Sequence, residues 1–259
     1  MKPLLPDVTL VMVETREHAL AKLAVDDCCR KMSFADVVIV TDRPQLFERQ
    51  ASYKVVQDWP TKLGWSRSWW YDVPKLVHTS HTLNIQWDSW VWDASIWSDE
   101  FLKYDYVGAP WWYDDGKNVG NGGFSLVSTR LKRFLLDNRG AFPCDTPVDD
   151  DLLCRKYRPD LESVGFRWAP EKVAYDFSYE GCGPQGHPNT EPPTRHFGFH
   201  AMFNWGTVLK DDERGLAERL ELAAFSPYIR DGYMMKAFLD RNPRIVTELL
   251  GRATLEAAE

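Results

Sequence analysis

Several features that mark common protein classes are missing from this 259-residue chain. No apolar run approaches the ~20 residues that a membrane helix needs, and the first ten residues (MKPLLPDVTL) lack the apolar core of a signal peptide. The five cysteines are odd in number and form no CxxC pair, so we expect reduced thiols and a cytoplasmic location. A net charge of -7 argues against a broad surface for nucleic acid or anionic membranes.

The composition otherwise matches a folded α/β protein. Hydrophobic residues make up 44% and charged residues 27% of the chain. No internal repeat or sharp change in composition divides the sequence, so we expect one domain over residues 1–259 with a helical tail over 206–259. Ten of the twelve tryptophans lie between Trp59 and Trp112. We expect most of them in the core and some in a cleft, where indole rings stack on sugar faces.

A strand–helix–strand unit is predicted near the N-terminus. Residues 8–13 (VTLVMV) and 35–40 (ADVVIV) are apolar runs typical of buried parallel strands, and residues 17–32 have helical composition. Ligands of such sheets bind at the carboxyl ends of the strands. Glu14, Thr15 and Asp42 therefore fall where a nucleotide would lie. No GxGxxG sequence follows the first strand, which disfavours an ordinary dinucleotide-binding fold.

Further strands and helices complete an α/β pattern with a mostly parallel sheet flanked by helices. The expected strands cover residues 83–91, 106–109 and 124–128, with a glycine-rich loop over 116–123. The expected helices cover residues 66–76, ended or kinked by Pro74, and residues 131–138. Two further helices should begin in the tail, at Ser226-Pro227 and at Asn242-Pro243.

Asp88 is the first candidate for chemistry. It lies in the sequence IQWD at the end of a predicted buried strand, where a carboxylate is costly without a partner. Mg²⁺ or Mn²⁺ bridging a diphosphate would be such a partner, because both prefer hard oxygen ligands. A turn or helix-capping aspartate is the alternative.

The acidic triplet at residues 149–151 is the second candidate. Thr146 is expected to cap a helix, with Pro147 in its first position and the three aspartates in its first turn. Helical neighbours point about 100° apart, so one carboxylate can face a cleft while the others do not. Crowding by like charge raises the pKa of a carboxylate and suits it to take a proton. An ordinary acidic first turn is the alternative.

Two further segments carry weaker signals. Asn121, Gly122 and Gly123 permit close approach of the backbone to a sugar or phosphate, or form a plain turn. His200 either reaches a metal across the cleft or is a hydrogen-bonded core residue. A zinc site from Cys182, His187, His196 and His200 matches no standard spacing.

In order, these segments resemble a family of short bacterial and viral glycosyltransferases with a GT-A-like fold. The resemblance runs from about residue 83 to residue 200 and is carried by IQWD (85–88), YDYVGAPW (104–111), GNGGFSL (120–126), the acidic triplet and FGFH (197–200). It implies a nucleotide-binding half over about residues 1–110 and an acceptor half over about 111–205. It also implies a nucleotide-sugar donor, a UDP-sugar first of all, and a glycan or other hydroxyl acceptor.

The resemblance implies a role for each candidate. Asp88 stands in for the DxD metal motif, although Trp90 occupies the place of its second acid, and His200 completes the Mn²⁺ or Mg²⁺ site. Asp150, or Asp149 if the register slips by one, is the general base of an inverting transfer. Asn121, Gly122 and Gly123 border the donor sugar and the acceptor. Glu14, Thr15 and Asp42 are assigned to the nucleoside because of their position at the strand ends, and no sequence motif supports that assignment.

Other functions stay open on the sequence alone. The acidic residues also suit a metal-dependent phosphoesterase or nucleotide hydrolase, and the tryptophans suit a non-catalytic carbohydrate-binding protein. A modified DNA base is a possible acceptor if Arg130, Lys132 and Arg133 form a local basic patch. The Gly/Pro-rich residues 181–193 suit a closing lid. Retention of configuration and any oligomeric state are equally open.

Overall fold

The computed structural model describes residues 2–47, 52–55, 61–181 and 195–245. The chain divides into two compact units, Met1–His200 and Ala201–Glu259, each described here by itself. The first unit holds every strand of the described residues, and the described part of the second is helical.

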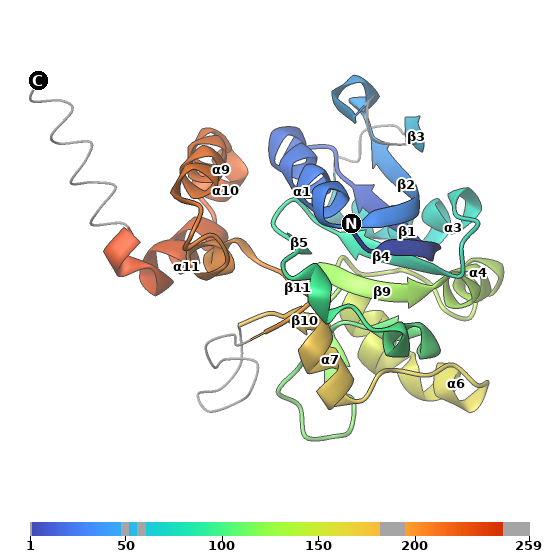
Figure 1. Cartoon of the computed structure of the whole chain (residues 1–259). Coiled ribbons are helices and arrows are strands. Elements are labelled where there is room, and N and C mark those ends of the chain that lie inside the picture. The colour runs from blue at the N-terminus through green and yellow to red at the C-terminus, as the bar shows by residue number, and fades with distance from the viewer. Residues whose placement is uncertain (1, 48–51, 56–60, 182–194, 246–259) are drawn as a thin grey trace, which may run out of the picture. The chain divides into compact units, whose positions relative to one another are not determined.

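A six-stranded sheet with the order β3-β2-β1-β4-β9-β6 forms the centre of the first unit (Figure 1). Strands β3, β2, β1 and β4 run parallel to one another, and β9 is antiparallel to both β4 and β6. Their bounds are β1 Leu4–Val13, β2 Ser33–Thr41, β3 Ser52–Val55, β4 His81–Ile85, β9 Phe124–Ser128 and β6 Tyr106–Val107. The prediction of a mostly parallel sheet flanked by helices is confirmed.

The strand order places a topological switch point at β1. The chain moves from β1 outward to β2 and β3, and then returns to the other side of β1 to form β4. Crossovers that leave in opposite directions open a crevice at the carboxyl ends of the two central strands. β9 is antiparallel to β4, with Phe124 opposite Ile85, so the residues just before β9 also reach this end of the sheet.

Two short sheets and the remaining helices surround the central sheet. β10 (Ser178–Tyr179), β11 (Gly198–Phe199) and β5 (Trp90–Val91) form one small sheet, and β7 (Ala109–Pro110) pairs with β8 (Val119–Gly120). The helices and helical turns of this unit are α1 His18–Lys31, η1 Pro44–Phe47, α2 Lys62–Tyr71, α3 Val73–Leu76, η2 Ala94–Ile96, η3 Asp99–Lys103, α4 Thr129–Asp137, α5 Asp149–Asp151, η4 Leu152–Lys156, α6 Arg158–Ser163 and α7 Glu171–Phe177.

Alternating side chains give the sheet two different faces. Val11, Val13 and Val127 pack with α2, α4 and α6 in one apolar cluster that includes Trp69 and Trp70. The opposite face includes Phe124, whose ring lies 5.2 Å from that of Phe177 in α7 and 5.8 Å from that of Phe197, centroid to centroid. Most described tryptophans are buried or partly buried, as expected for a core role.

Three predicted boundaries are wrong in detail. The strand predicted over 83–91 is broken after Ile85, because the backbone N–H of Gln86 donates to Oγ of Ser89 and forms a turn. The helix predicted over 66–76 begins earlier, at Lys62, and breaks at Asp72. Thr146 does not cap the acidic helix: its hydroxyl accepts from the N–H of Val148, and the helix begins at Asp149 and continues as a π-helical turn.

The second unit contains η5 Met202–Asn204, α8 Trp205–Val208, α9 Glu213–Phe225, α10 Pro227–Arg230 and α11 Tyr233–Arg241. The predicted cap at Ser226 is present, because its hydroxyl accepts from the N–H of Ile229 at 3.3 Å. Among the described residues, no helix is long and apolar enough to cross a membrane.

Candidate active site

The carboxyl ends of β1 and β2 hold the residues predicted to bind a nucleoside. Glu14 is 4% exposed, and its Oε1 accepts from the backbone N–H groups of Thr15, Arg16 and Glu17. Burial raises the pKa of this carboxyl, against the lowering effect of the N–H donors. Asp42 contacts Nε2 of His18 at 2.5 Å. Glu14 and Asp42 thus each have a structural partner, and nucleoside binding stays a prediction.

Asp88 lies in the turn between β4 and β5, at the crevice beside the switch point. It is 1% exposed. The next residue, Ser89, donates its hydroxyl to the carbonyl oxygen of Gly123 at 2.6 Å, which ties the Asp88 turn to the glycine segment before β9. This turn, rather than a continuous strand, brings the Asp88 carboxylate to the end of the sheet.

The glycine segment is shaped by one side chain and one close contact. Asn121 has a positive φ of 68°, and its Oδ1 accepts from the N–H of Gly123 at 2.8 Å. A Cβ atom on Gly123 would lie 2.2 Å from the ring of His200, so no larger residue fits there without displacing the imidazole. Glycine at this position is therefore required for His200 to occupy its place.

His200 is surrounded by carboxylates. Its Nδ1 lies 2.9 Å from Oε2 of Glu180, and its Nε2 lies 3.5 Å from Oδ1 of Asp88. Burial alone would lower the pKa of His200, but the charges of Glu180 and Asp88, with a smaller contribution from Asp150, raise it to about 9. The amide of Asn121 also donates to Glu180 and fixes that carboxylate.

Asp88 and His200 are two of the ligands that a divalent cation site would need. In metal sites, a carboxylate that holds Nδ1 of a histidine orients Nε2 toward the metal, and here Nε2 of His200 faces the Asp88 carboxylate. Among the described residues, however, no group of three or more His, Cys, Asp or Glu side chains is arranged to hold a metal ion by itself. Any cation bound between Asp88 and His200 needs further oxygen ligands, such as those of a diphosphate.

The three aspartates of the acidic triplet have different surroundings, and two of them, rather than the one expected, line a pocket. Oδ2 of Asp150 accepts from the N–H of Gly122 at 3.1 Å, whereas Oδ1 of Asp149 accepts from the hydroxyl of Ser66 at 3.3 Å. The side chain of Asp151 is 55% exposed, and it lies 3.7 Å from Arg155. Burial raises the pKa of Asp150, and burial with the neighbouring Asp150 charge raises the pKa of Asp149 to about 7.

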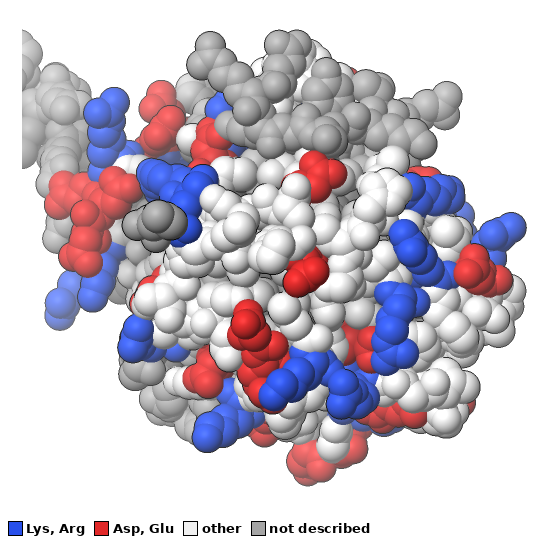
Figure 2. Space-filling model, turned by 45° about the vertical axis from the view of Figure 1, so that its right-hand side comes forward, with Lys and Arg blue, Asp and Glu red and all other residues white. Residues whose placement is uncertain are grey.

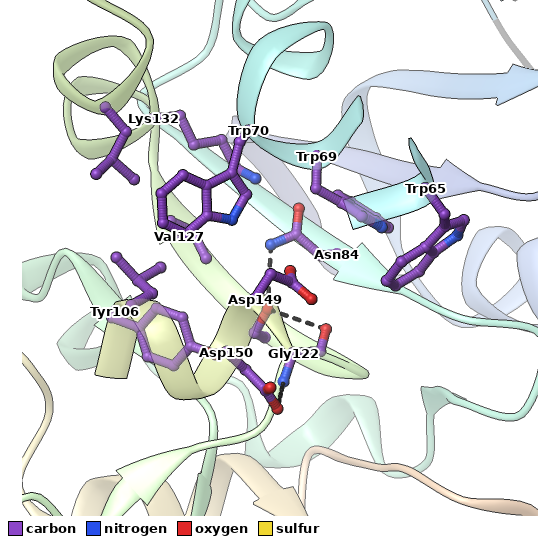
Figure 3. A pocket seen from close by; sticks show the side chains of 13 residues that line it. Trp65, Trp69, Trp70, Asn84, Tyr106, Gly122, Val127, Lys132, Asp149 and Asp150 are labelled. Carbon is purple, nitrogen blue, oxygen red and sulfur yellow. Dashed lines mark hydrogen bonds between the residues drawn. The ribbon is translucent and has the colours of Figure 1, made fainter. Parts of the chain in front are cut away.

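A pocket opens beside the two buried aspartates (Figure 3). The space inside it that water can enter is about 40 Å³. Three tryptophans of α2 form one wall, and α4 and the ends of β4 and β9 contribute the others. The lining residues are Trp65, Trp69, Trp70, Asn84, Tyr106, Gly122, Ser125, Val127, Lys132, Leu135, Asp149, Asp150 and Leu153.

The basic patch predicted from Arg130, Lys132 and Arg133 is wrong. Lys132 is 6% exposed and faces the tryptophan-lined pocket. Arg130 and Arg133 line a separate groove, in which Arg130 pairs with Asp105. Successive helical positions point in different directions, so the three cations never share one surface. In Figure 2, isolated acidic side chains lie within a broad, mostly uncharged area, and the Lys and Arg side chains of the face shown lie around that area.

The zinc and lid predictions concern residues that lie mostly outside the described part of the chain. Cys182 and His187 are not described, nor is any residue of the predicted 181–193 lid except Gly181. His196 is 1% exposed, and its Nδ1 lies 2.5 Å from the carbonyl oxygen of Tyr175. Its ring stacks at 5.3 Å from that of Tyr179. His196 therefore has the surroundings of a core histidine.

With this geometry in view, residues 62–200 match the family model described as a protein of unknown function, DUF5672. The chain belongs to the DUF5672 family. The match spans more than half of the sequence and includes every segment around Asp88, Asp150 and His200. A comparison with curated proteins finds no match.

Solved structures similar to this DUF5672 protein include three transferases. A glycosyltransferase involved in glycosylation of the major capsid of PBCV-1 is 13% identical, with a TM-score of 0.47 over 74% of this chain and 92% of that one. The mannosyltransferase PcManGT from Pyrobaculum calidifontis, in complex with GDP-Man and Mn²⁺, is 13% identical, with a TM-score of 0.45 over 98% of this chain and 81% of that one. The apo-form glycosyltransferase GlyE from Streptococcus pneumoniae is 11% identical, with a TM-score of 0.44 over 74% of this chain and 53% of that one. With TM-scores below 0.5, the fold assignment rests on the strand order described above.

No sequence signal indicated Glu180, and the sequence suggested a surface patch rather than this pocket for Lys132. Glu180 follows a two-residue strand, β10, that has no recognisable sequence pattern. Lys132 carried a usable signal, because it lies beside Leu131 and three positions before Leu135 on a predicted helix, and both leucines are buried. A lysine on the buried side of a helix is uncommon and marks a site to inspect.

We expect Gly123→Ala to displace the His200 ring, because the new Cβ would overlap it. The cost should be roughly 1–3 kcal/mol of stability, as for other overpacking substitutions. Gly122→Ala is the matched control, since its Cβ would meet Asp150 at an ordinary 3.5 Å. Urea unfolding and the imidazole NMR signals of His200 measure both effects. Equal results for the two variants would contradict this packing.

Without metal, stability should fall as the pH rises from about 6.5 to about 9. The pKa of folded His200, about 9, exceeds its ordinary value of 6.5, so its contribution is complete below pH 6.5 and lost above pH 9. We expect a loss on the order of 2 kcal/mol in urea unfolding with EDTA. Glu180→Gln should flatten this dependence, and Asp160→Asn, at an exposed carboxylate of α6, should not. An unchanged profile in Glu180→Gln would exclude the pairing.

Proposed function

We propose that this protein is a glycosyltransferase that moves a sugar from a nucleoside-diphosphate sugar to an acceptor hydroxyl. One observation carries the proposal: the turn from Asn121 to Gly123 contacts both Asp150 and His200. A proton acceptor and a cation-attracting cluster therefore flank the same short backbone segment. The motif resemblance in residues 83–200 supports the same reading.

The charge around His200 supports a bound diphosphate and divalent cation. Asp88, Glu180 and Asp150 carry three negative charges near a single imidazole, so the cluster has a deficit of positive charge. Asp88 and His200 would hold Mn²⁺ or Mg²⁺, with Glu180 orienting the imidazole. When bound, the cation would supply positive charge that stabilises the departing nucleoside diphosphate. Glu14, Thr15 and Asp42 lie at the carboxyl ends of β1 and β2, where the nucleoside would extend, with a UDP-sugar expected first.

Asp150 is the proposed general base. Its raised pKa and its place beside Gly122 suit it to take the proton of the acceptor hydroxyl as that oxygen attacks the anomeric carbon. The bond between the anomeric carbon and the diphosphate oxygen breaks in the same displacement, which inverts the configuration. Asp149 instead accepts a hydrogen bond from the hydroxyl of Ser66 and lines the tryptophan-walled pocket. A glycan acceptor is favoured over a DNA base, because Arg130 and Arg133 do not share a surface with Lys132.

We expect Asp150→Asn to lower sugar transfer by about 100-fold or more while leaving nucleotide binding unchanged, because it removes the proton acceptor but keeps the shape. Products formed from UDP- and GDP-sugars with Mn²⁺ and a panel of neutral oligosaccharides are followed by mass spectrometry. Asp151→Asn is the matched control, since the Asp151 side chain is 55% exposed.

The products separate the proposal from its rivals. Glycosylated acceptor that depends on Asp150 supports transfer. Free sugar or phosphate as the sole product, even with acceptor present, would identify a hydrolase. Glycan binding without nucleotide or metal, unchanged in Asp150→Asn, would identify a carbohydrate-binding protein.

A further inference from the structure

Lys132 is an unusual residue in the pocket of Figure 3. It is 6% exposed, and among the described residues its ammonium group makes no hydrogen bond and no ion pair within 4.0 Å. Its Nζ lies 5.4 Å from the centroid of the Trp69 ring. Burial lowers the pKa of Lys132 to about 7, against the opposing attraction of Asp149. A buried ammonium needs polar partners, because its three donors lose their bonds to water. The pocket is where those partners must bind.

Two further polar atoms in the same pocket have no partner. Asn84 is 3% exposed; its Nδ2 donates to Oγ of Ser125 at 3.1 Å, but its Oδ1 accepts no hydrogen bond from the described residues. The indole N–H of Trp69 is buried and likewise has no acceptor. Together with the Lys132 ammonium, these atoms give a polar ligand three hydrogen-bonding groups along one pocket.

Two polar side chains, Asn84 and Ser125, lie on a face of the sheet that is otherwise largely apolar. Asn84 and Ser125 occupy the same face of the sheet as Val11 and Val127, which pack in the apolar cluster beneath α2 and α4. Apolar side chains at these two positions would extend that cluster. Instead, Figure 3 shows Asn84 lying between Lys132 and Asp149, with Trp69 beside them.

The charges of the pocket favour a neutral ligand over an acidic one. Asp149 and Asp150 line the same pocket as Lys132, whose pKa burial lowers to about 7. The pocket therefore has no excess of positive charge that would attract an anionic ligand. A hydroxyl group can accept a hydrogen bond from Lys132 and donate one to Oδ1 of Asn84. The tryptophan wall suits the apolar face of a sugar ring.

We propose that Lys132, Asn84 and the α2 tryptophans form a subsite that binds the hydroxyl groups of a neutral sugar and discriminates against acidic sugars. This assignment rests on the proposed function and adds to it the substrate class. The sugar comes either from the donor or from the acceptor, and the chemistry of recognition is the same in both cases.

The first test measures binding without turnover. Calorimetry with Mn²⁺ compares UDP-glucose, UDP-galactose and GDP-mannose with UDP and GDP, and compares UDP-glucose with UDP-glucuronic acid. Methyl glycosides of glucose, galactose and mannose are titrated separately by ligand-observed NMR. We expect at least one neutral sugar to bind, either as a gain over its diphosphate or as the glycoside, and the acidic sugar to bind at least tenfold more weakly than its neutral counterpart.

Lys132→Met tests the subsite directly. It keeps the length of the side chain and removes its donors, so the neutral sugar should lose at least tenfold in affinity while UDP and GDP bind within twofold of wild type. The melting temperature is measured alongside, to verify that the variant folds. Lys132→Gln restores a donor and should recover part of the affinity. Arg133→Met, on the exposed side of α4, is the matched control and should change nothing.

The outcomes separate the possibilities. A loss confined to nucleotide-sugars assigns the donor sugar, and a loss confined to glycosides or to the acceptor KM assigns the acceptor. Sugar binding that depends on Lys132 but without transfer supports the subsite and rejects the enzyme. Transfer that is unaffected by Lys132→Met, equal weakening of UDP and UDP-glucose, or binding of no sugar at all would overturn the subsite.

Discussion

The candidate site depends on a buried excess of negative charge around one imidazole. Asp88, Glu180 and Asp150 approach His200 from three separate segments, which follow β4, follow β10 and form α5. Carboxylates gathered at the end of a sheet repel one another and lose hydration, so they need positive charge to be stable. Protonated His200 supplies part of it in the free protein, and the proposed cation would supply more in the complex.

This constraint connects the backbone to the chemistry. His200 reaches the carboxylates because Gly123 leaves space for its ring, and Gly123 is held by the side chain of Asn121 and the hydroxyl of Ser89. The same segment offers the N–H of Gly122 to Asp150. A single turn therefore sets the distance between the proposed proton acceptor and the proposed cation site. Lys132 and Asn84 extend the site into the neighbouring pocket, where the cost of their burial is explained by a polar ligand.

The sequence predicted the parts of the site that depend on local patterns. The strand–helix–strand unit, the glycine segment and the burial of Asp88 follow from runs of apolar residues and from glycine chemistry. Two aspartates of the acidic triplet, rather than the one expected, line the pocket, and the capping role given to Thr146 was wrong. The turn at residues 86–89 was missed, because a side-chain hydrogen bond from Ser89 interrupts an otherwise continuous strand pattern. The position of Glu180 depends on tertiary packing, which local patterns do not encode, whereas the buried helix side marked by Leu131 and Leu135 is a local signal for Lys132. Nucleoside binding by Glu14, Thr15 and Asp42 stays a prediction.

The most direct test of the central claim is a calorimetric titration with UDP, GDP and CDP, each with and without Mn²⁺, in wild type and in Asp88→Asn. The account predicts that one nucleoside diphosphate binds in a Mn²⁺-dependent manner and that the variant loses this dependence. Binding that ignores both Mn²⁺ and Asp88, or no binding of any diphosphate, would contradict it.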